Sequence, residues 1–281
     1  MSKRRIVIYI ILPILLISGG WDVFSRYIRP NHYQLLFPYS IFQFRNLSTT
    51  QTRLGRDGRL QIMIPAGNAS LGKNDYFEEI FADGYWIDQI PVTVKDYKEY
   101  LKLNPSLPPR YHDEYYRYWE KRQFELLPVV FVSWGQAEEY CEFFGGHLPT
   151  EIQWEKAARG TMGNILYWDD SIKAFNKANY DNFYNGKTPS GWLPAGKTVY
   201  GVLDMSGNVR EWAMDWLLEE NQRLNQDAWI SQREIIEENL GRILKGGSYA
   251  DDVSHLRLNS RDAHDPNSPG LNRGFRCVYE R

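Results

Sequence analysis

The sequence predicts an α+β fold with much irregular loop, in a single domain of residues 60–281. Three observations lead to this class. Short strand-like segments are followed by a few helices with clear capping signals, the helices and strands do not alternate as they do in a parallel α/β fold, and turn residues interrupt the second half of the chain. Aromatic residues make up 15% of the chain, enough to build a core in a domain with little regular structure.

Three apolar segments are predicted to be strands. Leu60–Ile64 alternates as a half-buried strand does and stops at Pro65. Tyr85–Ile90 is a second short strand, and the apolar run Pro128–Val132 is a third.

Helices are predicted where a capping residue precedes an apolar face. Thr93 is the expected N-cap of a helix that buries Tyr97, Tyr100 and Leu101. Ser133 precedes a second helix, which places Ala137, Tyr140, Cys141 and Phe144 on its core face and ends at Gly145-Gly146. Thr150 begins a third helix, with Trp154, Ala157 and Ala158 facing inward. Residues 104–127 have no clean period and are interpreted as an inserted surface segment.

The start of the chain forms its own unit. Lys3, Arg4 and Arg5 precede an apolar run that reaches about Trp21. A membrane-spanning helix needs about 20 apolar residues, so the run is short unless it continues to Phe24. We favour a membrane anchor at 1–24 over a cleaved signal peptide, followed by a stalk at 25–59.

Either interpretation of residues 1–24 places the main domain outside the cytoplasm, because positive charge stays on the inner side. The protein is then expected in the cell membrane as a single-pass protein, with the domain in the periplasm if the source is a Gram-negative bacterium. The net charge of −2, with no basic run after the N-terminus, gives no reason to expect nucleic acid as a partner.

The chain has two cysteines, Cys141 and Cys277. In an exported protein an even number of cysteines usually forms disulfides, whereas in a cytosolic protein the same pair would be two buried thiols. We favour the bridge.

Four segments carry more specific information than the fold class. They read, in order along the chain, Val132-Ser133-Trp134 with His147-Leu148-Pro149-Thr150-Glu151 and the helix to Gly160; Gly201-Val202-Leu203-Asp204-Met205-Ser206-Gly207-Asn208-Val209-Arg210-Glu211-Trp212; Lys245-Gly246-Gly247-Ser248-Tyr249; and Gly274-Phe275-Arg276-Cys277.

In this order and spacing the segments resemble the formylglycine-generating enzyme (sulfatase-modifying factor) family over about residues 60–281. The resemblance implies a compact, loop-rich, C-type-lectin-like domain. It also supports the Cys141–Cys277 bridge, because some members of the family link these two positions. His147 and Arg210 depart from the pattern, where the family usually has Arg and Trp, and Lys245 and Tyr249 replace a usual Arg and Trp.

The resemblance further implies bound calcium. The matching positions are the side chains of Asp204 and Glu211 with the carbonyls of Gly207 and Val209, a set of hard oxygen ligands that suits Ca²⁺. The alternative is an Asp that caps the turn and a Glu that is held by a nearby Arg. A second calcium site would use Asn179 and the carbonyl of Tyr180, but the loop 181–196 diverges and its other ligands cannot be matched.

The cysteines that the family uses for catalysis are missing from the segment that follows Gly246-Gly247-Ser248. Formylglycine generation uses two cysteines after the Gly-Gly-Ser segment to hold Cu(I), which requires soft thiolates. No Cys lies between Ser248 and Arg276, and the hard carboxylates of Asp251 and Asp252 stand there instead. Copper is therefore not expected, and neither is formylglycine generation.

The histidines at 32, 112, 147, 255 and 264 do not have the spacing of an iron-binding facial triad. A cluster near the expected groove could bind a metal or a ligand, although such a run is more often a solvated loop; its members are Asp251, Asp252, His255, His264 and Asp265. The residues of the possible ligand groove are Tyr249, Asp251, Asp252, His255, Arg257 and Arg261.

Two functions remain. The first is an extracytoplasmic binding or regulatory module whose groove and insert 104–127 contact a protein, peptide or glycan. The second is an oxidoreductase of the same family with an altered metal site or substrate. Activity on a sulfatase-type cysteine peptide distinguishes the two.

Overall fold

A computed structural model describes residues 50–72, 77–81, 83–104, 121–160, 174–217 and 241–281. All of these belong to one compact unit, residues 42–281. Within these ranges no helix has the length and apolar character needed to cross a membrane. The predicted anchor at 1–24, most of the stalk and residues 105–120 of the predicted insert lie outside the described residues.

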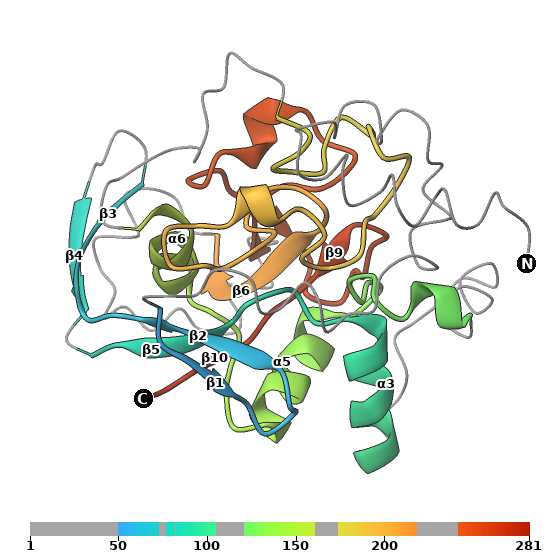
Figure 1. Ribbon diagram of the computed structural model, residues 1–281, viewed down its shortest axis with the longest axis horizontal. Coiled ribbons are helices and arrows are strands. Elements are labelled where there is room, and N and C mark those ends of the chain that lie inside the picture. Colours follow the sequence, from blue (N-terminus) through green and yellow to red (C-terminus); the bar gives the residue numbers. More distant parts are fainter. Residues whose placement is uncertain (1–49, 73–76, 82, 105–120, 161–173, 218–240) are drawn as a thin grey trace, which may run out of the picture. The chain divides into compact units, whose positions relative to one another are not determined.

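The first sheet contains two of the predicted strands. It has four strands in the order β1-β2-β5-β10, and all neighbouring pairs are antiparallel; the strands are β1 (Thr52–Leu54), β2 (Leu60–Ile64), β5 (Tyr85–Asp88) and β10 (Val278–Tyr279). β2 and β5 confirm the predictions for Leu60 onward and Tyr85 onward, although β5 ends two residues early, at Asp88. Figure 1 shows that β10 brings the C-terminal segment beside the N-terminal strands.

The domain begins before the predicted boundary at residue 60. Thr52 pairs with Ile62 and Leu54 with Leu60, so β1 completes an edge of the first sheet. This segment falls within the predicted stalk, and in the structure its Thr52 and Leu54 side chains are exposed. An edge strand therefore left no hydrophobic signal.

The second sheet carries the motif segments. Its order is β8-β7-β6-β9, with β6 (Arg210–Trp216), β7 (Arg242–Lys245), β8 (Asp262–His264) and β9 (Arg273–Gly274). β6 and β9 are parallel, and the other pairs are antiparallel. A separate hairpin pairs β3 (Gly67–Leu71) with β4 (Phe77–Phe81).

All three predicted helices are present and have the expected caps. They are α3 (Val94–Leu103), α5 (Trp134–Phe143) and α6 (Glu151–Arg159). Thr93, Ser133 and Thr150 each accept a hydrogen bond from the third residue of the helix, whose side chain bonds back to the cap. This reciprocal arrangement satisfies two backbone donors at each helix start. Single-turn 3₁₀ helices occur at η4 (Arg122–Phe124), η5 (Pro194–Gly196) and η6 (Val253–Leu256).

The prediction of a strand at Pro128–Val132 is wrong. Only an isolated bridge joins Pro128 to Thr93, and the rest of the segment is irregular. Phe131 has a φ of 61°, which a strand does not allow, and Pro128 has no backbone N–H to donate. The apolar run is nevertheless buried at Val129, Val130 and Val132, so the pattern indicated burial correctly and strand geometry incorrectly.

The core lies between the helices and the two sheets. One cluster joins aromatic residues of α3 and α5 with Trp212 and Phe275, and a second joins Trp154 of α6 with β2 and β5. Tyr97 and Tyr140 stack at 5.7 Å between ring centroids. The predicted disulfide Cys141–Cys277 is present and fully buried in the first cluster, where it ties α5 to the residue that precedes β10.

Candidate functional site

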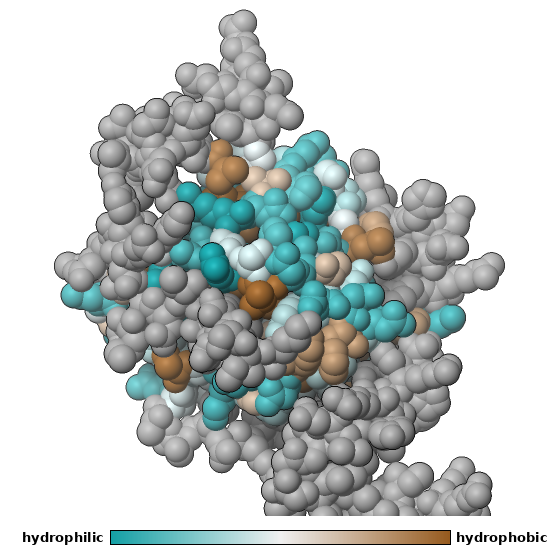
Figure 2. All heavy atoms as spheres, turned by 90° about the horizontal axis from the view of Figure 1, so that it is seen from above, coloured by the Kyte–Doolittle hydropathy of each residue, from teal (hydrophilic) through white to brown (hydrophobic). Residues whose placement is uncertain are grey.

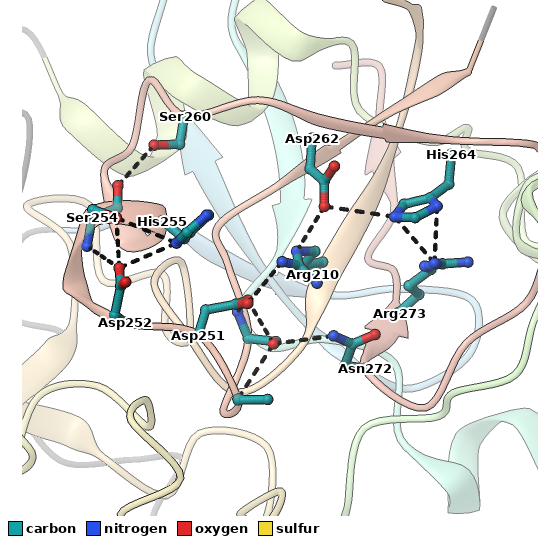
Figure 3. A network of polar contacts seen from close by, with 12 residues as sticks. Arg210, Asp251, Asp252, Ser254, His255, Ser260, Asp262, His264, Asn272 and Arg273 are labelled. Atoms are coloured by element: carbon teal, nitrogen blue, oxygen red, sulfur yellow. Dashed lines mark hydrogen bonds and ion pairs between the residues drawn. The ribbon is translucent and has the colours of Figure 1, made fainter.

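The segment that should carry the family's chemistry is closed by hydrogen bonds of its own (Figure 3). The backbone N–H and the hydroxyl of buried Ser248 both donate to Asp251 Oδ2, at 2.8 and 2.7 Å. The amide of Asn272 donates to the Ser248 hydroxyl at 3.2 Å. Ser248 is therefore buried and held in place by Asp251 and Asn272.

Arg210 links this turn to the second sheet. Its guanidinium contacts Asp251 at 2.8 Å and Asp262 at 3.1 Å. The row continues from Asp262 to His264 at 3.7 Å and from His264 to Arg273 at 2.9 Å. We call these five residues the groove network. The carboxylates of Asp251 and Asp262 flank Arg210, and His264 lies between Asp262 and Arg273 (Figure 3).

Sequence reasoning found only part of the groove network. Asp251 was predicted, and His264 was noted nearby, but Arg210, Asp262 and Arg273 were not proposed as site residues. The sequence signal that could have indicated this network is Arg210 itself, which stands where the family usually has Trp. In the structure Arg210 of β6 pairs with Arg273 of the neighbouring strand β9. A charged residue in that position needs a partner of opposite charge, and Asp251 supplies it.

The predicted groove residues Asp252 and His255 lie together on η6. The Asp252 carboxylate accepts hydrogen bonds from Ser254 and contacts His255 Nδ1 at 3.1 Å. Hydrogen bonds from Ser254, and then from His255, lower the pKa of Asp252 to about 2. Asp252 thus presents a fixed negative charge to solvent.

The remaining predicted groove residues differ in what they offer a ligand. Arg257 is exposed, and Tyr249 is half-buried with the Lys187 ammonium 5.5 Å from its ring centre. Burial lowers the pKa of Lys187 to about 8. Arg261, by contrast, is turned inward, where its guanidinium binds both carboxylate oxygens of Glu151. Arg261 therefore links the predicted groove segment to Glu151.

Glu151 belongs to a buried ionic cluster. Lys245, fully buried, lies 3.3 Å from Glu151 and 3.4 Å from Glu155. Arg159 adds a 2.6 Å contact with Glu155. The cluster fixes β7 against α6 one residue before the Gly246-Gly247-Ser248 turn, so it positions the groove.

The surface on this side of the molecule is mainly hydrophilic. η6 lies at the top of Figure 1, and Figure 2 views the molecule from above. The described residues there are mostly polar, with separate hydrophobic spots in place of one continuous patch. Such a surface suits recognition through hydrogen bonds and charge.

The turn predicted to bind calcium packs against Asn179, a residue predicted for the second calcium site. Gly207 forms a bridge with Asn179, and a Cβ at Gly207 would lie 2.2 Å from the Asn179 carbonyl oxygen, so only glycine fits. Asp204 accepts hydrogen bonds from the Gly191 N–H and the Asn208 amide. Burial raises the pKa of Asp204 to about 6.

Glu211 has an internal partner, as in the alternative that the sequence left open. Arg276 binds both of its oxygens at 2.7 Å, and Trp154 donates to Oε2 at 2.8 Å. A Ca²⁺ ion here would have to share the carboxylate with this guanidinium. In the described residues, no group of three or more His, Cys, Asp or Glu side chains is arranged to hold a metal.

At the second predicted calcium site, Asn179 is buried and its Oδ1 has no hydrogen-bond partner among the described residues. Its amide nitrogen donates to the Gly186 carbonyl at 2.9 Å. A buried, unpaired carbonyl oxygen fits a hard cation. The other carboxylates that such a site needs are not assembled around it in the part of the chain that is described.

The donor set does not fit Cu(I). Both cysteines of the chain are joined in the buried disulfide, so no thiolate is available. At the groove, Asp251 is bonded to Ser248 and Arg210. No step through copper is derived for this protein.

The fold, the four motif segments and the buried disulfide define a loop-rich domain of the sulfatase-modifying type. Residues 46–281 match the Sulfatase-modifying factor enzyme 1-like domain family, and the chain belongs to that family.

Two relatives and one solved structure are similar to this chain. It is 29% identical over 213 residues to a serine/threonine-protein kinase, pkn1, of Chlamydia caviae, which covers 71% of this chain and 34% of the kinase. It is 32% identical over 172 residues to the formylglycine-generating enzyme of Mus musculus, which covers 54% of this chain and 44% of that enzyme. The chain thus spans less than half the length of either relative. PvdO from Pseudomonas aeruginosa has the same fold, with a TM-score of 0.65 at 22% identity over 85% of this chain and all of PvdO.

Proposed function

We propose that this chain is a binding or regulatory module that uses the sulfatase-modifying fold as a scaffold and does not generate formylglycine. One observation carries the proposal: the chain has no free thiol, and Asp251 in the segment that should supply thiolates is bonded to Arg210 and Ser248. Formylglycine generation is named for the mouse relative, and its transfer to this chain would require soft ligands that the sequence lacks.

The ligand of the module is proposed to be a protein, peptide or glycan that contacts the groove. Asp252, His255, Arg257 and Tyr249 offer a fixed negative charge, an imidazole, a cation and an aromatic ring at its surface. Their mixture of charges favours a ligand with several polar groups over an apolar one, because an apolar ligand would leave these groups without partners.

The domain is further proposed to be held at the outer side of a membrane by residues 1–24. Support comes from the basic residues that precede the apolar run and from the buried disulfide, which is typical of oxidising compartments. The groove would then face other envelope components.

Calcium is proposed as a structural ion at the turn 204–211, with Asp204 and the carbonyls of Gly207 and Val209 as ligands and Glu211 shared with Arg276. A second ion would use Asn179 and the carbonyl of Tyr180. Bound Ca²⁺ would neutralise Asp204 and stabilise this loop. Removing the ion with a chelator should lower Tm.

A variant that tests calcium binding must not destabilise the protein for another reason. Glu211→Ala would also leave Arg276 buried without its partner and would destabilise the protein with or without the ion. Asp204→Ala and Asn179→Ala avoid that effect. Each should reduce the Tm difference between calcium and chelator, and an unchanged Tm on chelation of the unmutated protein would exclude structural calcium.

Site-specific photocrosslinking tests the groove. A photoreactive residue at Arg257 should capture a partner from the native envelope, whereas the same residue at Lys102, exposed on α3, should not. Asp252→Lys and His255→Ala, which lie at the exposed surface, should reduce the capture without lowering Tm. Equal capture from both positions, or capture unaffected by the two substitutions, would argue against a groove ligand.

A further inference from the structure

A concave site lies away from the predicted groove residues. A cavity of about 380 Å³ opens between the end of β2, the start of β5 and the loop at residues 199–200. No residue of the groove is among those that line it in the described part of the chain. The wall includes Met63, Gly84, Val199 and Tyr200, and the polar groups include Gln51 and Arg281.

The cavity is built into the strand geometry. Met63 of β2 pairs with Trp86 of β5 and lines the cavity. Gly84 lines the cavity beside it, where a Cβ would come within 2.8 Å of the Ile64 carbonyl oxygen and 3.2 Å of Met63 Sδ. A side chain at 84 would therefore displace Met63, so the bare glycine keeps the cavity open.

The apolar side chains that line the cavity are partly exposed to water. Val199 is 68% exposed, and the Tyr200 ring packs only partly against the second core cluster. A ligand that covered these side chains would gain the free energy of removing apolar surface from water. Methionine sulfur also contacts aromatic rings favourably, which suits a flat aromatic body.

The charged side chain at the cavity is a cation. Arg281 has the one charged side chain among the described lining residues, and its guanidinium makes no hydrogen bond or ion pair with the part of the chain that the structure describes. A guanidinium without a carboxylate partner offers a planar pair of donors that match a carboxylate. The Gln51 amide adds a further polar group at the same cavity.

We propose that this cavity binds a small aromatic carboxylate, with its ring against Met63 and Tyr200 and its carboxylate on Arg281. The site is separate from the groove, so its occupancy does not depend on the function proposed for the groove residues.

Calorimetric titration of the full chain with 3-phenylpropionate tests the proposal. The neutral 3-phenylpropanamide, of the same size, should bind about two- to fivefold more weakly, which is what one exposed ion pair contributes. Arg281→Gln should abolish that preference and leave the amide's affinity unchanged. Arg257→Gln, at the groove, should change neither affinity.

A second variant tests the cavity itself. Ala66 is exposed and lines the cavity, so Ala66→Trp should fill it and weaken both ligands about tenfold or more with little change in Tm. If that variant is unstable, Val199→Glu places an anion at the cavity from an exposed position and should invert the preference between the two ligands. The proposal is overturned if 3-phenylpropionate shows no saturable binding, or if it binds the filled or acidic variant as it binds the unmutated chain.

Discussion

Single residues explain why this member of the family differs from its catalytic relatives. Arg210 stands where the family usually has Trp, and Asp251 stands in the segment where the copper enzymes have thiolates; in the structure the two form an ion pair at 2.8 Å. Arg210 also contacts Asp262, and Asp251 also accepts hydrogen bonds from Ser248. Together they satisfy each other, so the two departures from the family pattern are explained by one contact.

At the buried pair Glu211–Arg276, one substitution should be very costly. Arg276 lies in the core and also donates to backbone carbonyls of residues 88, 89 and 203. Arg276→Met leaves the Glu211 carboxylate buried without its counter-ion and should lower the free energy of unfolding by about 3–5 kcal/mol. Urea denaturation in the presence of a chelator measures this change without compensation by calcium.

The matched control is Lys102→Met, which removes an exposed pair with Glu99 and should cost about 1 kcal/mol or less. Equal costs for the two substitutions would contradict the importance assigned to the buried pair.

His264 should make stability depend on pH. Burial, and next the nearby Arg273 guanidinium, lower the pKa of His264 below its usual value, while Asp262 opposes the shift. The unfolded chain therefore takes up a proton at a higher pH than the folded protein does. This contribution to stability is complete above about pH 6.5 and is lost as the pH falls through the folded pKa.

His264→Gln removes that contribution. Tm should then decline less steeply between about pH 7.5 and 5 than in the unmutated protein. Calorimetry over this range measures both slopes, and identical slopes would show that the pKa of His264 is the same in both states.

At the scale of elements, local signals predicted the helices well and the non-local features poorly. Thr93, Ser133 and Thr150 lie within the helices' own capping boxes, so the sequence around each was enough to identify it. β1 and the irregular segment at Pro128 depend on contacts with distant residues, such as Ile62 and Gly270. No local pattern contains that information.

The disulfide joins two elements that are far apart in the chain. Cys141 lies in α5 and Cys277 just before β10, at a sequence separation of 136. Replacing both by Ala should lower the free energy of unfolding by about 3–5 kcal/mol, because the unfolded chain gains the freedom that the closed loop had denied it. Urea denaturation of the double variant measures the loss, and a difference below about 1 kcal/mol would contradict this account.

At the scale of the whole molecule, the motifs predicted the scaffold more fully than the site. The segments around Trp154, Trp212 and Phe275 form the core that their aromatic residues indicated. In the site, the position of Asp251 could be predicted, but its ion pair with Arg210 could not, because it joins residues from two separate segments. Arg261 was expected at the groove surface and is instead bound to Glu151, since only the fold reveals the buried carboxylate beneath it.

The central claim is that the family scaffold is retained while its copper chemistry is lost. Incubation of the purified chain with copper and a sulfatase-type cysteine peptide, followed by mass spectrometry of the peptide, tests it most directly. A formylglycine-generating enzyme under the same conditions serves as the positive control. We predict no aldehyde above the level produced by copper alone, and turnover above that level would contradict the claim.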